Sequence, residues 1–259
     1  MEKYLLTLDR GNSSAKLALW GEDGRIVRHI HTRSGSDEAE CVRLVLDAAS
    51  SGAIIGAAYS SVVKDGGDEA VMNALREVVD GAGLCLELGA DTPMPMGVEY
   101  ATPATLGADR LAAALGALSL FGPGRAMLVV DMGSAITYDI VDPAGTYRGG
   151  NIAPGIQARF RGLHEVAPAL PLLNGAEGRG KLPVFGDSTE TAIRAGVVRG
   201  VEAEIRFYSR LLGGESLTVL TGGVAEAFDQ AVGGLPGSHI EPDLIHNGLK
   251  RLFEYNETL

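Results

Sequence analysis

Residues 3–14, KYLLTLDRGNSS, and residues 126–134, AMLVVDMGS, decide the fold of this chain because they repeat one pattern. In each copy an apolar run reads as a buried strand that ends in Asp-x-Gly and continues into small hydroxyl residues. A turn glycine follows at almost the same spacing in both, Gly24 after the first aspartate and Gly145 after the second. The repeat predicts two similar domains that face each other across a cleft. Coincidence is the alternative, since Asp-x-Gly is short and turns favour it.

The pattern around these two copies predicts an α/β fold. Strands alternating with amphipathic helices indicate parallel strands joined by crossovers. The expected elements are strands at 3–9, 15–20, 25–32, 53–60, 84–88, 126–131, 135–141, 147–152 and 216–220, and helices at 37–49, 69–79 and 105–120. The last helix ends at Gly122-Pro123-Gly124, a strong breaker. We therefore expect an N-terminal domain at 1–121 and a C-terminal domain at 122–259.

Composition excludes several classes of protein. With 46% apolar and 21% charged residues in 259, the chain has the balance of a globular protein with a sizeable core. The formal charge of -11 and the absence of a Lys/Arg run argue against a nucleic-acid partner. The longest apolar stretch, 111–122, falls short of the roughly 20 residues that span a bilayer. We expect a cytoplasmic protein with no membrane partner, whose two cysteines are reduced core residues.

The Asp-x-Gly turns are candidate phosphate sites. Glycine after aspartate lets successive backbone N–H groups point at phosphate oxygens, while the carboxylate holds Mg²⁺ directly or through water. An acidic chain repels a nucleotide at long range, so such a site must act locally. Two ordinary hairpin turns are the alternative. The residues suited to this role are Asp9, Gly11, Asn12, Ser13 and Ser14 in the first copy and Asp131, Gly133 and Ser134 in the second.

Two glycine-rich segments resemble nucleotide motifs less specifically. Thr221-Gly222-Gly223 follows a strand and opens a helix, which suits a flat adenine or ribose but equally any tight connection. Residues 175–181, GAEGRGK, match the start of a P-loop. The next residue is Leu182, which cannot bind Mg²⁺, and Pro183 prevents the long helix that a P-loop opens. We interpret 175–181 as a mobile loop.

Asp109 and Arg110 begin an otherwise apolar helix. The carboxylate could accept a proton from a substrate hydroxyl, and the guanidinium could bind a substrate carboxylate with two hydrogen bonds. Ordinary solvation of a helix N-terminus is the alternative. The five histidines show no metal-binding spacing, and no Gly-x-Ser-x-Gly motif indicates a hydrolase.

Several segments, in order along most of the chain, resemble type III pantothenate kinases, which belong to the acetate and sugar kinase superfamily. They are LDRGNSSAKLALW at 8–20, YSSVV at 59–63, EYATPATLGADR at 99–110, VVDMGSAITYDIVDPAGTYRGGNIAPGI at 129–156, STETAIRAG at 188–196, LTGG at 220–223 and PDLIHNGL at 242–249. The resemblance implies two duplicated actin-like (ribonuclease H-like) domains. It also implies ATP-dependent phosphorylation of pantothenate to 4'-phosphopantothenate, the first step of coenzyme A biosynthesis.

The same resemblance implies roles for individual residues. Asp109 would be the catalytic base, and Asp131 would bind the monovalent cation, K⁺ or NH₄⁺, that the family needs beside ATP and Mg²⁺. The pantothenate pocket would hold Tyr100, Gly107, Ala108, Asp109, Arg110 and Thr189. ATP would contact Asp9, Arg10, Gly11, Asn12, Ser13, Ser14, Ala15, Lys16 and Ser134. Members are generally homodimers whose pantothenate site is completed at the subunit interface.

The sequence departs from the family pattern at a few positions. Arg10 and Lys16 stand where the family often has apolar residues, and either adds a nucleotide contact or pairs with surface acids. Ser13 and Ser134 replace more frequent threonines and keep the hydroxyl. Two alternative functions stay open. In these, the protein is either a non-catalytic relative that acts as a transcriptional accessory factor or another small-molecule kinase of the superfamily.

Overall fold

The computed structural model of the chain describes residues 2–32, 37–63, 67–81, 83–175 and 181–259. They form two compact units. Unit 1 consists of Met1–Gly122 together with Leu244–Leu259, and unit 2 consists of Pro123–Asp243. The first change of unit falls after Gly122, within the Gly-Pro-Gly segment.

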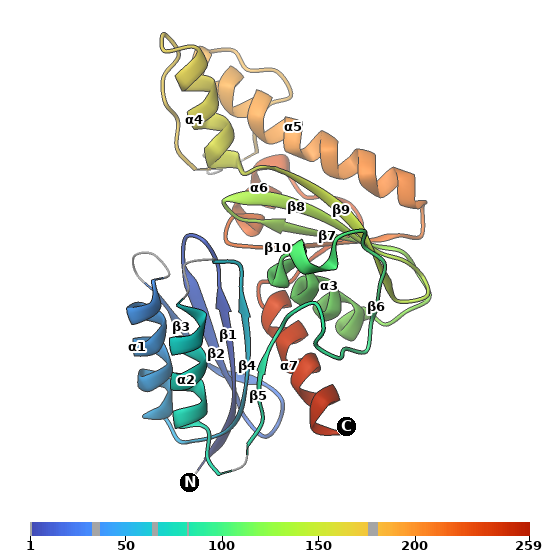
Figure 1. The fold of residues 1–259 in the computed structure, drawn as a ribbon. Coiled ribbons are helices and arrows are strands. Elements are labelled where there is room, and N and C mark those ends of the chain that lie inside the picture. Colours follow the sequence, from blue (N-terminus) through green and yellow to red (C-terminus); the bar gives the residue numbers. More distant parts are fainter. Residues whose placement is uncertain (1, 33–36, 64–66, 82, 176–180) are drawn as a thin grey trace. The chain divides into compact units, whose positions relative to one another are not determined.

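Figure 1 shows the strands and helices of the described residues, coloured along the chain. The strands are β1 (Lys3–Arg10), β2 (Ala15–Trp20), β3 (Ile26–His31), β4 (Ala53–Ser61), β5 (Cys85–Glu87), β6 (Gly97–Val98), β7 (Met127–Met132), β8 (Ala135–Val141), β9 (Thr146–Pro154), β10 (Leu217–Thr221) and β11 (Ser238–Ile240). The helices are α1 (Glu38–Ala49), α2 (Asp68–Val78), α3 (Ala108–Phe121), α4 (Ile156–Val166), α5 (Thr189–Leu212), α6 (Ala225–Val232) and α7 (Leu244–Glu257), and η1 (Pro103–Thr105) is a short 3₁₀ turn.

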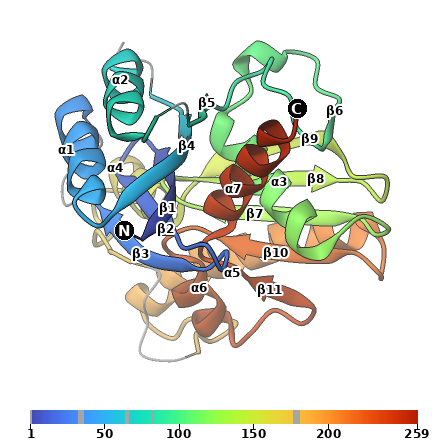
Figure 2. The same ribbon diagram turned by 90° about the horizontal axis from the view of Figure 1, so that it is seen from below.

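Unit 1 is a sheet with helices on both faces. Its strand order is β3-β2-β1-β4-β5, in which β1 runs antiparallel to β2 and parallel to β4. Helices α1 and α2 cover one face, and α3 and α7 lie against the other (Figures 1 and 2). The apolar side chains that alternate along β1 and β4 pack against α1 and α2, with Leu8 and Tyr59 fully buried among them.

The helices of unit 1 form for different local reasons. In α1 the buried residues recur at helical spacing, and the Asp37 side chain accepts a hydrogen bond of 2.9 Å from the Glu40 N–H at the helix start. In α3 almost every residue from Ala108 to Ala117 is buried. A helix that is apolar all round is one packed on several sides, which agrees with its Ala- and Leu-rich sequence.

The final helix differs from the predicted division, because α7 belongs to unit 1 and not to the C-terminal domain. It packs on α3 at two glycines: a Cβ on Gly116 would lie 2.1 Å from the Leu244 carbonyl oxygen, and one on Gly248 would lie 1.9 Å from that of Ala112. The two helix backbones touch at these points. Such a close approach depends on a pairing of distant residues, so local periodicity gives no sign of it.

Unit 2 repeats the strand plan of unit 1. Its strands follow the order β9-β8-β7-β10-β11, with β7 antiparallel to β8 and parallel to β10. The predicted duplication is therefore present in the topology of both units. Helices α4, α5 and α6 share one apolar core with this sheet, which includes Phe160, Ile205 and Phe228. The sequence patterns had indicated the start of α6, whereas α4 and α5 have no counterpart among the predicted elements.

No helix within the described residues combines the length and the apolar character needed to cross a membrane. Neither cysteine forms a disulfide bond with another described residue; Cys41 is buried and Cys85 half-buried.

Candidate active site

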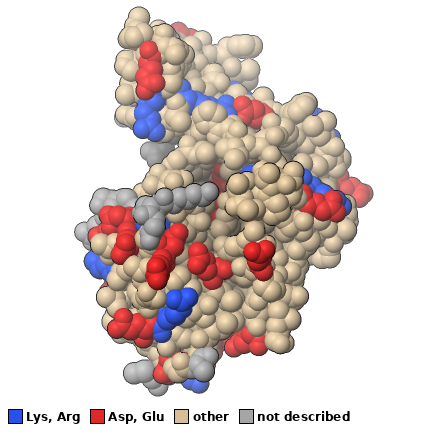
Figure 3. Space-filling view, in the orientation of Figure 1, with Lys and Arg blue, Asp and Glu red and all other residues tan. Residues whose placement is uncertain are grey.

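The predicted site residues fall in both units. Unit 1 carries the first Asp-x-Gly turn together with Tyr100 and residues 107–110, and unit 2 carries Asp131, Ser134 and Thr189. Figure 3 shows acidic side chains over the region of α1 and α2 and basic side chains scattered across the same view.

The first turn begins where β1 ends beside β4. Asp9 lies opposite Ser60 in the parallel register, and the Ser60 hydroxyl donates a hydrogen bond of 2.9 Å to Asp9 Oδ1. Asp9 is only 8% exposed. A carboxylate in such a place loses most of its hydration, and one neutral hydrogen bond does not replace it. The position therefore favours an added proton or cation.

Two effects raise the pKa of Asp9 to about 6. Burial is the larger and the negative charge of Asp109 the smaller, while the bond from Ser60 and the charge of Lys16 lower this pKa. Carboxylates that oppose each other's ionisation are common where a cation binds or a proton moves. The described residues contain no cluster of three or more metal-ligating side chains. Mg²⁺ carried by nucleotide phosphates needs only one or two carboxylates, so Asp9 fits this mode.

The backbone of the first turn is tight and polar. The Gly11 N–H donates a hydrogen bond of 3.0 Å to the Ser14 carbonyl, and Asn12 and Ser13 between them are exposed. Ala15 is buried at the start of β2, and Lys16 is paired with Asp9 across the two strands. This pairing explains why Lys16 lowers the pKa of Asp9.

Arg10 points into the protein. Its side chain is fully buried, and its Nη1 lies 3.0 Å from Asp68 Oδ1. Of the two roles left open for Arg10, the structure therefore shows pairing with an acid, although the guanidinium is not at the surface. A nucleotide contact from Arg10 stays a prediction. Asp68 was not among the predicted residues, because the sequence gives no sign of which helix meets the end of β1.

Asp109 lies in the first turn of α3. Its Oδ1 accepts a hydrogen bond of 2.7 Å from the Arg110 N–H, as acidic residues at helix N-termini do. A Cβ on Gly107 would lie 2.5 Å from the same oxygen, so the glycine leaves room for this carboxylate. Asp109 is also close enough to Asp9 to raise its pKa. The GADR segment thus brings a second carboxylate to the end of β1.

Tyr100 and Arg110, both predicted to contact the substrate, lie together in unit 1. The Arg110 guanidinium carbon is 5.9 Å from the centre of the Tyr100 ring, within the range of a cation–π interaction. Arg110 is 6% exposed and Ala108 beside it is buried. A largely buried guanidinium held over an aromatic ring suits recognition of a single planar anion such as a carboxylate.

The second turn lies between two glycine loops of unit 2. Asp131 is opposite Thr221 in the register of β7 and β10. A Cβ on Gly222, where φ is +91°, would lie 2.4 Å from Asp131 Oδ1, and a Cβ on Gly155 would lie 2.4 Å from the Gly133 carbonyl oxygen. The two glycines therefore leave room for the Asp131 carboxylate and for the backbone of this turn. A carboxylate oxygen suits a hard cation, and a cation at Asp131 stays a prediction.

Arg159 hydrogen-bonds the loop that carries Gly155, and it was not among the residues predicted from the sequence. Its Nε donates a hydrogen bond of 2.8 Å to the Pro154 carbonyl, and its two terminal nitrogens each lie 2.7 Å from a carboxylate oxygen of Glu204. Tyr138 donates a hydrogen bond of 2.5 Å to the same carboxylate. The network joins α4, α5 and β8 behind the loop that carries Gly155.

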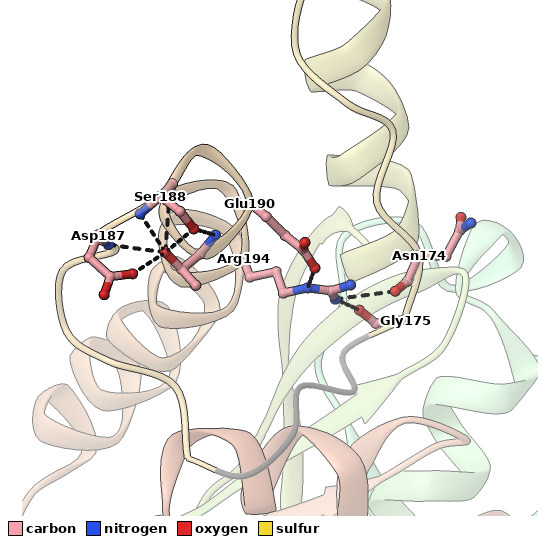
Figure 4. A network of polar contacts seen from close by, with 7 residues as sticks. Asn174, Gly175, Asp187, Ser188, Glu190 and Arg194 are labelled. Carbon is pink, nitrogen blue, oxygen red and sulfur yellow. Dashed lines mark hydrogen bonds and ion pairs between the residues drawn. The ribbon is translucent and has the colours of Figure 1, made fainter.

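Thr189 is the first residue of α5 and is exposed. Figure 4 shows the polar contacts around the start of this helix, with Ser188, Glu190 and Arg194 labelled. The helix start is fixed by a capping box, in which the Ser188 side chain accepts from the Thr191 N–H and the Thr191 hydroxyl accepts from the Ser188 N–H. One turn on, Arg194 binds Glu190 and the carbonyl oxygens of Asn174 and Gly175. Thr189 also lines a shallow apolar groove with Leu163, Leu170, Ala192, Ile193, Gly196 and Val197.

Most of the P-loop lookalike, residues 176–180, lies outside the described residues. Its last residue, Lys181, is described and lies against Gly233, whose added Cβ would be 2.8 Å from the lysine Nζ. Gly233 ends α6 in the left-handed conformation. An ammonium group there interacts favourably with the helix C-terminus, which explains Lys181 without a nucleotide.

Comparison with known proteins identifies the family. The sequence model of the type III pantothenate kinases matches residues 5–210. The chain belongs to the type III pantothenate kinase family. A type III pantothenate kinase of Porphyromonas gingivalis is 39% identical over 257 residues, which are 98% of this chain and 99% of the relative. Another member, from Phocaeicola vulgatus, is 36% identical over 258 residues, with the same shares of both chains covered.

Solved structures confirm the predicted fold class. The chain is similar to a protein provisionally described as a 2-dehydro-3-deoxygalactonokinase from Sinorhizobium meliloti, with a TM-score of 0.60, 14% identity and coverage of 99% of this chain and 100% of the other. It is also similar to the activator of 2-hydroxyisocaproyl-CoA dehydratase from Clostridium difficile, with a TM-score of 0.54, 13% identity and coverage of 98% and 96%. The chain therefore has the fold of the actin-like sugar kinases.

Proposed function

We propose that this protein transfers the γ-phosphoryl group of ATP to the hydroxyl of pantothenate, which gives 4'-phosphopantothenate and ADP at the start of coenzyme A biosynthesis. Membership of the family supports the substrate pair. The observation that carries the mechanism is the placement of Asp109, on an apolar helix, within electrostatic reach of the buried Asp9. A cytoplasmic location stays a prediction.

Asp109 is the proposed base. Its carboxylate accepts the proton of the pantothenate hydroxyl as that oxygen forms a bond to the γ-phosphorus, and the bond from this phosphorus to the β,γ-bridging oxygen breaks to release ADP. Because phosphoryl transfer needs positioning and charge compensation more than covalent chemistry, one carboxylate suffices for the protein's part in proton transfer.

Arg110 is the proposed partner of the pantothenate carboxylate. Its position over Tyr100 limits the directions in which the guanidinium can turn, which lowers the entropy lost when it binds an anion. Gly107 and Ala108 complete this side of the pocket in the proposal. Thr189 belongs to unit 2, and we propose that it reaches the pantothenate site of a partner subunit in a homodimer.

The chain has no P-loop lysine, so bound cations would have to compensate the charge of the ATP phosphates. Asp9 is the residue that would hold Mg²⁺ together with the ATP phosphates, and Asp131 is the one that would hold K⁺ or NH₄⁺. Bound there, these ions would neutralise charge on the transferring phosphoryl group. The proposed nucleotide contacts are Asp9, Gly11, Asn12, Ser13, Ser14, Ala15 and Lys16 in the first turn and Ser134 in the second.

A coupled ADP-release assay tests the function directly. The purified protein should release ADP with pantothenate and Mg–ATP, and not with a panel of sugars and amino sugars. Preference for a sugar would identify another kinase of the superfamily, and no turnover with any acceptor would favour a non-catalytic relative. Replacing K⁺ by Na⁺ should lower the rate, and indifference to that exchange would remove the monovalent cation from the proposal.

A further inference from the structure

Arg10 is the centre of a buried network behind the first turn. Neighbouring residues of a strand point to opposite faces of the sheet, so Arg10 extends away from Asp9 toward the side of α1 and α2. There its Nη1 lies 3.0 Å from Asp68 Oδ1, and the Tyr59 hydroxyl donates a hydrogen bond of 2.5 Å to the same oxygen. One carboxylate oxygen therefore joins the ends of β1 and β4 to the beginning of α2.

Burying a guanidinium at this position carries a large desolvation free energy. Arginine cannot lose its charge to escape burial, and removing it from water costs several kcal/mol that its partners must offset. The second copy of the repeat shows that the position does not require a charge for the strand to fold. Met132, which follows Asp131 as Arg10 follows Asp9, is fully buried in an apolar cluster.

The network holds Arg10 and Tyr59. These are the chain neighbours of the candidate metal ligand, Asp9, and of the residue that hydrogen-bonds it. Arg10 follows Asp9 on β1, and Tyr59 precedes Ser60 on β4. The Asp9–Ser60 hydrogen bond links the same two strands on the opposite face of the sheet. Asp68 Oδ1 thus adds a side-chain link between β1 and β4 next to the backbone pairing of Asp9 with Ser60.

We propose that Arg10, with Asp68 and Tyr59, is a positioning residue that aligns Asp9 and Ser60 for Mg–ATP binding. This inference rests on the proposed nucleotide role of the first turn, and it does not depend on which acceptor is phosphorylated. Displacements of about 1 Å at a reacting or binding group can cost up to 10²-fold in activity, so loss of the network is expected to weaken Mg–ATP binding measurably.

Arg10→Met tests the proposal, because it installs the residue that the second copy uses. Titration calorimetry of the full-length protein with Mg–ATP should give a dissociation constant about 10-fold higher than that of the wild type, while the KM for pantothenate changes less than about twofold. Arg10→Lys, which keeps the charge, should recover part of the affinity. A merely structural ion pair would lower the melting temperature and the active fraction without altering the dissociation constant of the folded protein.

Arg28→Met is the matched control. Arg28 on β3 pairs with Asp47 on α1 at 2.9 Å, also between a strand and a helix of unit 1, with both side chains about two-fifths exposed. This variant should bind Mg–ATP as the wild type does. Unchanged affinity in Arg10→Met, or an equal loss in Arg28→Met, would overturn the inference.

Tyr59→Phe keeps the proposal testable if Arg10→Met does not fold. It removes one hydrogen bond to Asp68 and keeps the ion pair, and we expect about a threefold weaker affinity for Mg–ATP; an unchanged value would count against the network. A wild-type protein that binds Mg–ATP but does not phosphorylate pantothenate would refute the proposed function and leave this inference standing. A wild-type protein that binds no Mg–ATP would refute the inference.

Discussion

The two Asp-x-Gly turns share a backbone plan and differ in their surroundings. Behind the first turn a buried guanidinium pairs with a carboxylate, whereas behind the second Met132 is packed among apolar side chains. Asp9 is almost completely buried and bonded to Ser60, and Asp131 is half-buried and packed against Gly222. The duplication has therefore kept the strand order and the strand-end aspartate but not the chemistry around them. The first turn relies on charged groups and the second on close backbone packing.

The largest expected effect concerns Asp109, the carboxylate near the first turn. Asp109→Asn should lower turnover by roughly 10²-fold or more, the scale of a lost general base, and leave Mg–ATP binding nearly intact. Steady-state kinetics with pantothenate and calorimetry with Mg–ATP check both parts. An equal loss of nucleotide affinity would show that Asp109 is structural.

A substitution at Gly222, which packs against the second turn, should destabilise the protein. Gly222→Ala places a Cβ on a residue with φ of +91° and 2.4 Å from Asp131 Oδ1, so unfolding should become easier by about 2–3 kcal/mol. Thermal unfolding measures the loss, and activation by K⁺ should weaken in the same variant.

Gly223→Ala is the control for this change. The next glycine has no atom within 4 Å of an added Cβ and no left-handed backbone. Its substitution should alter stability by less than about 0.5 kcal/mol. Similar losses in the two variants would contradict the role given to contact with Asp131.

The buried charge of the first turn should appear as a pH dependence of stability. Because the folded-state pKa of Asp9 is raised from 3.8 to about 6, the folded protein holds this proton more tightly than the unfolded chain. The resulting stability is fully present below pH 3.8 and is lost as the pH rises through 6. Between pH 4 and 6 the loss should be about 2 kcal/mol.

Asp9→Asn isolates this contribution. Between pH 4 and 6 the unfolding free energy of the variant should gain about 2 kcal/mol relative to the wild type. Urea unfolding followed by the fluorescence of Trp20, the single tryptophan of the chain, measures both proteins. Parallel pH profiles for the two proteins would show that Asp9 titrates normally.

The smallest effects are expected at the hydroxyl residues that the two turns share. Ser13→Thr and Ser134→Thr each add one methyl group to an exposed side chain and keep the hydroxyl. Stability should change by less than about 0.5 kcal/mol, and the affinity for Mg–ATP by less than about twofold. A large loss in one variant only would show that one turn holds the nucleotide more closely than the other.

Much of the fold could be predicted because its signals are local. The strand β2, the hairpin after each aspartate and the break at residue 122 follow from alternation and turn residues within short windows. Helix α7 could not be assigned to unit 1 in this way. Its place depends on Gly116 and Gly248, which matter only once α3 and α7 are paired.

The candidate site divides in the same manner. The sequence by itself determined the strand-end aspartates, the GADR segment and the family, since each depends on residue types at fixed spacing. Only the tertiary structure decided that Ser60 bonds Asp9, that Asp109 opposes its ionisation and that Arg10 turns inward to Asp68. The physical reason is that burial and charge interactions depend on distances through space between segments far apart in the chain, which a linear pattern does not contain.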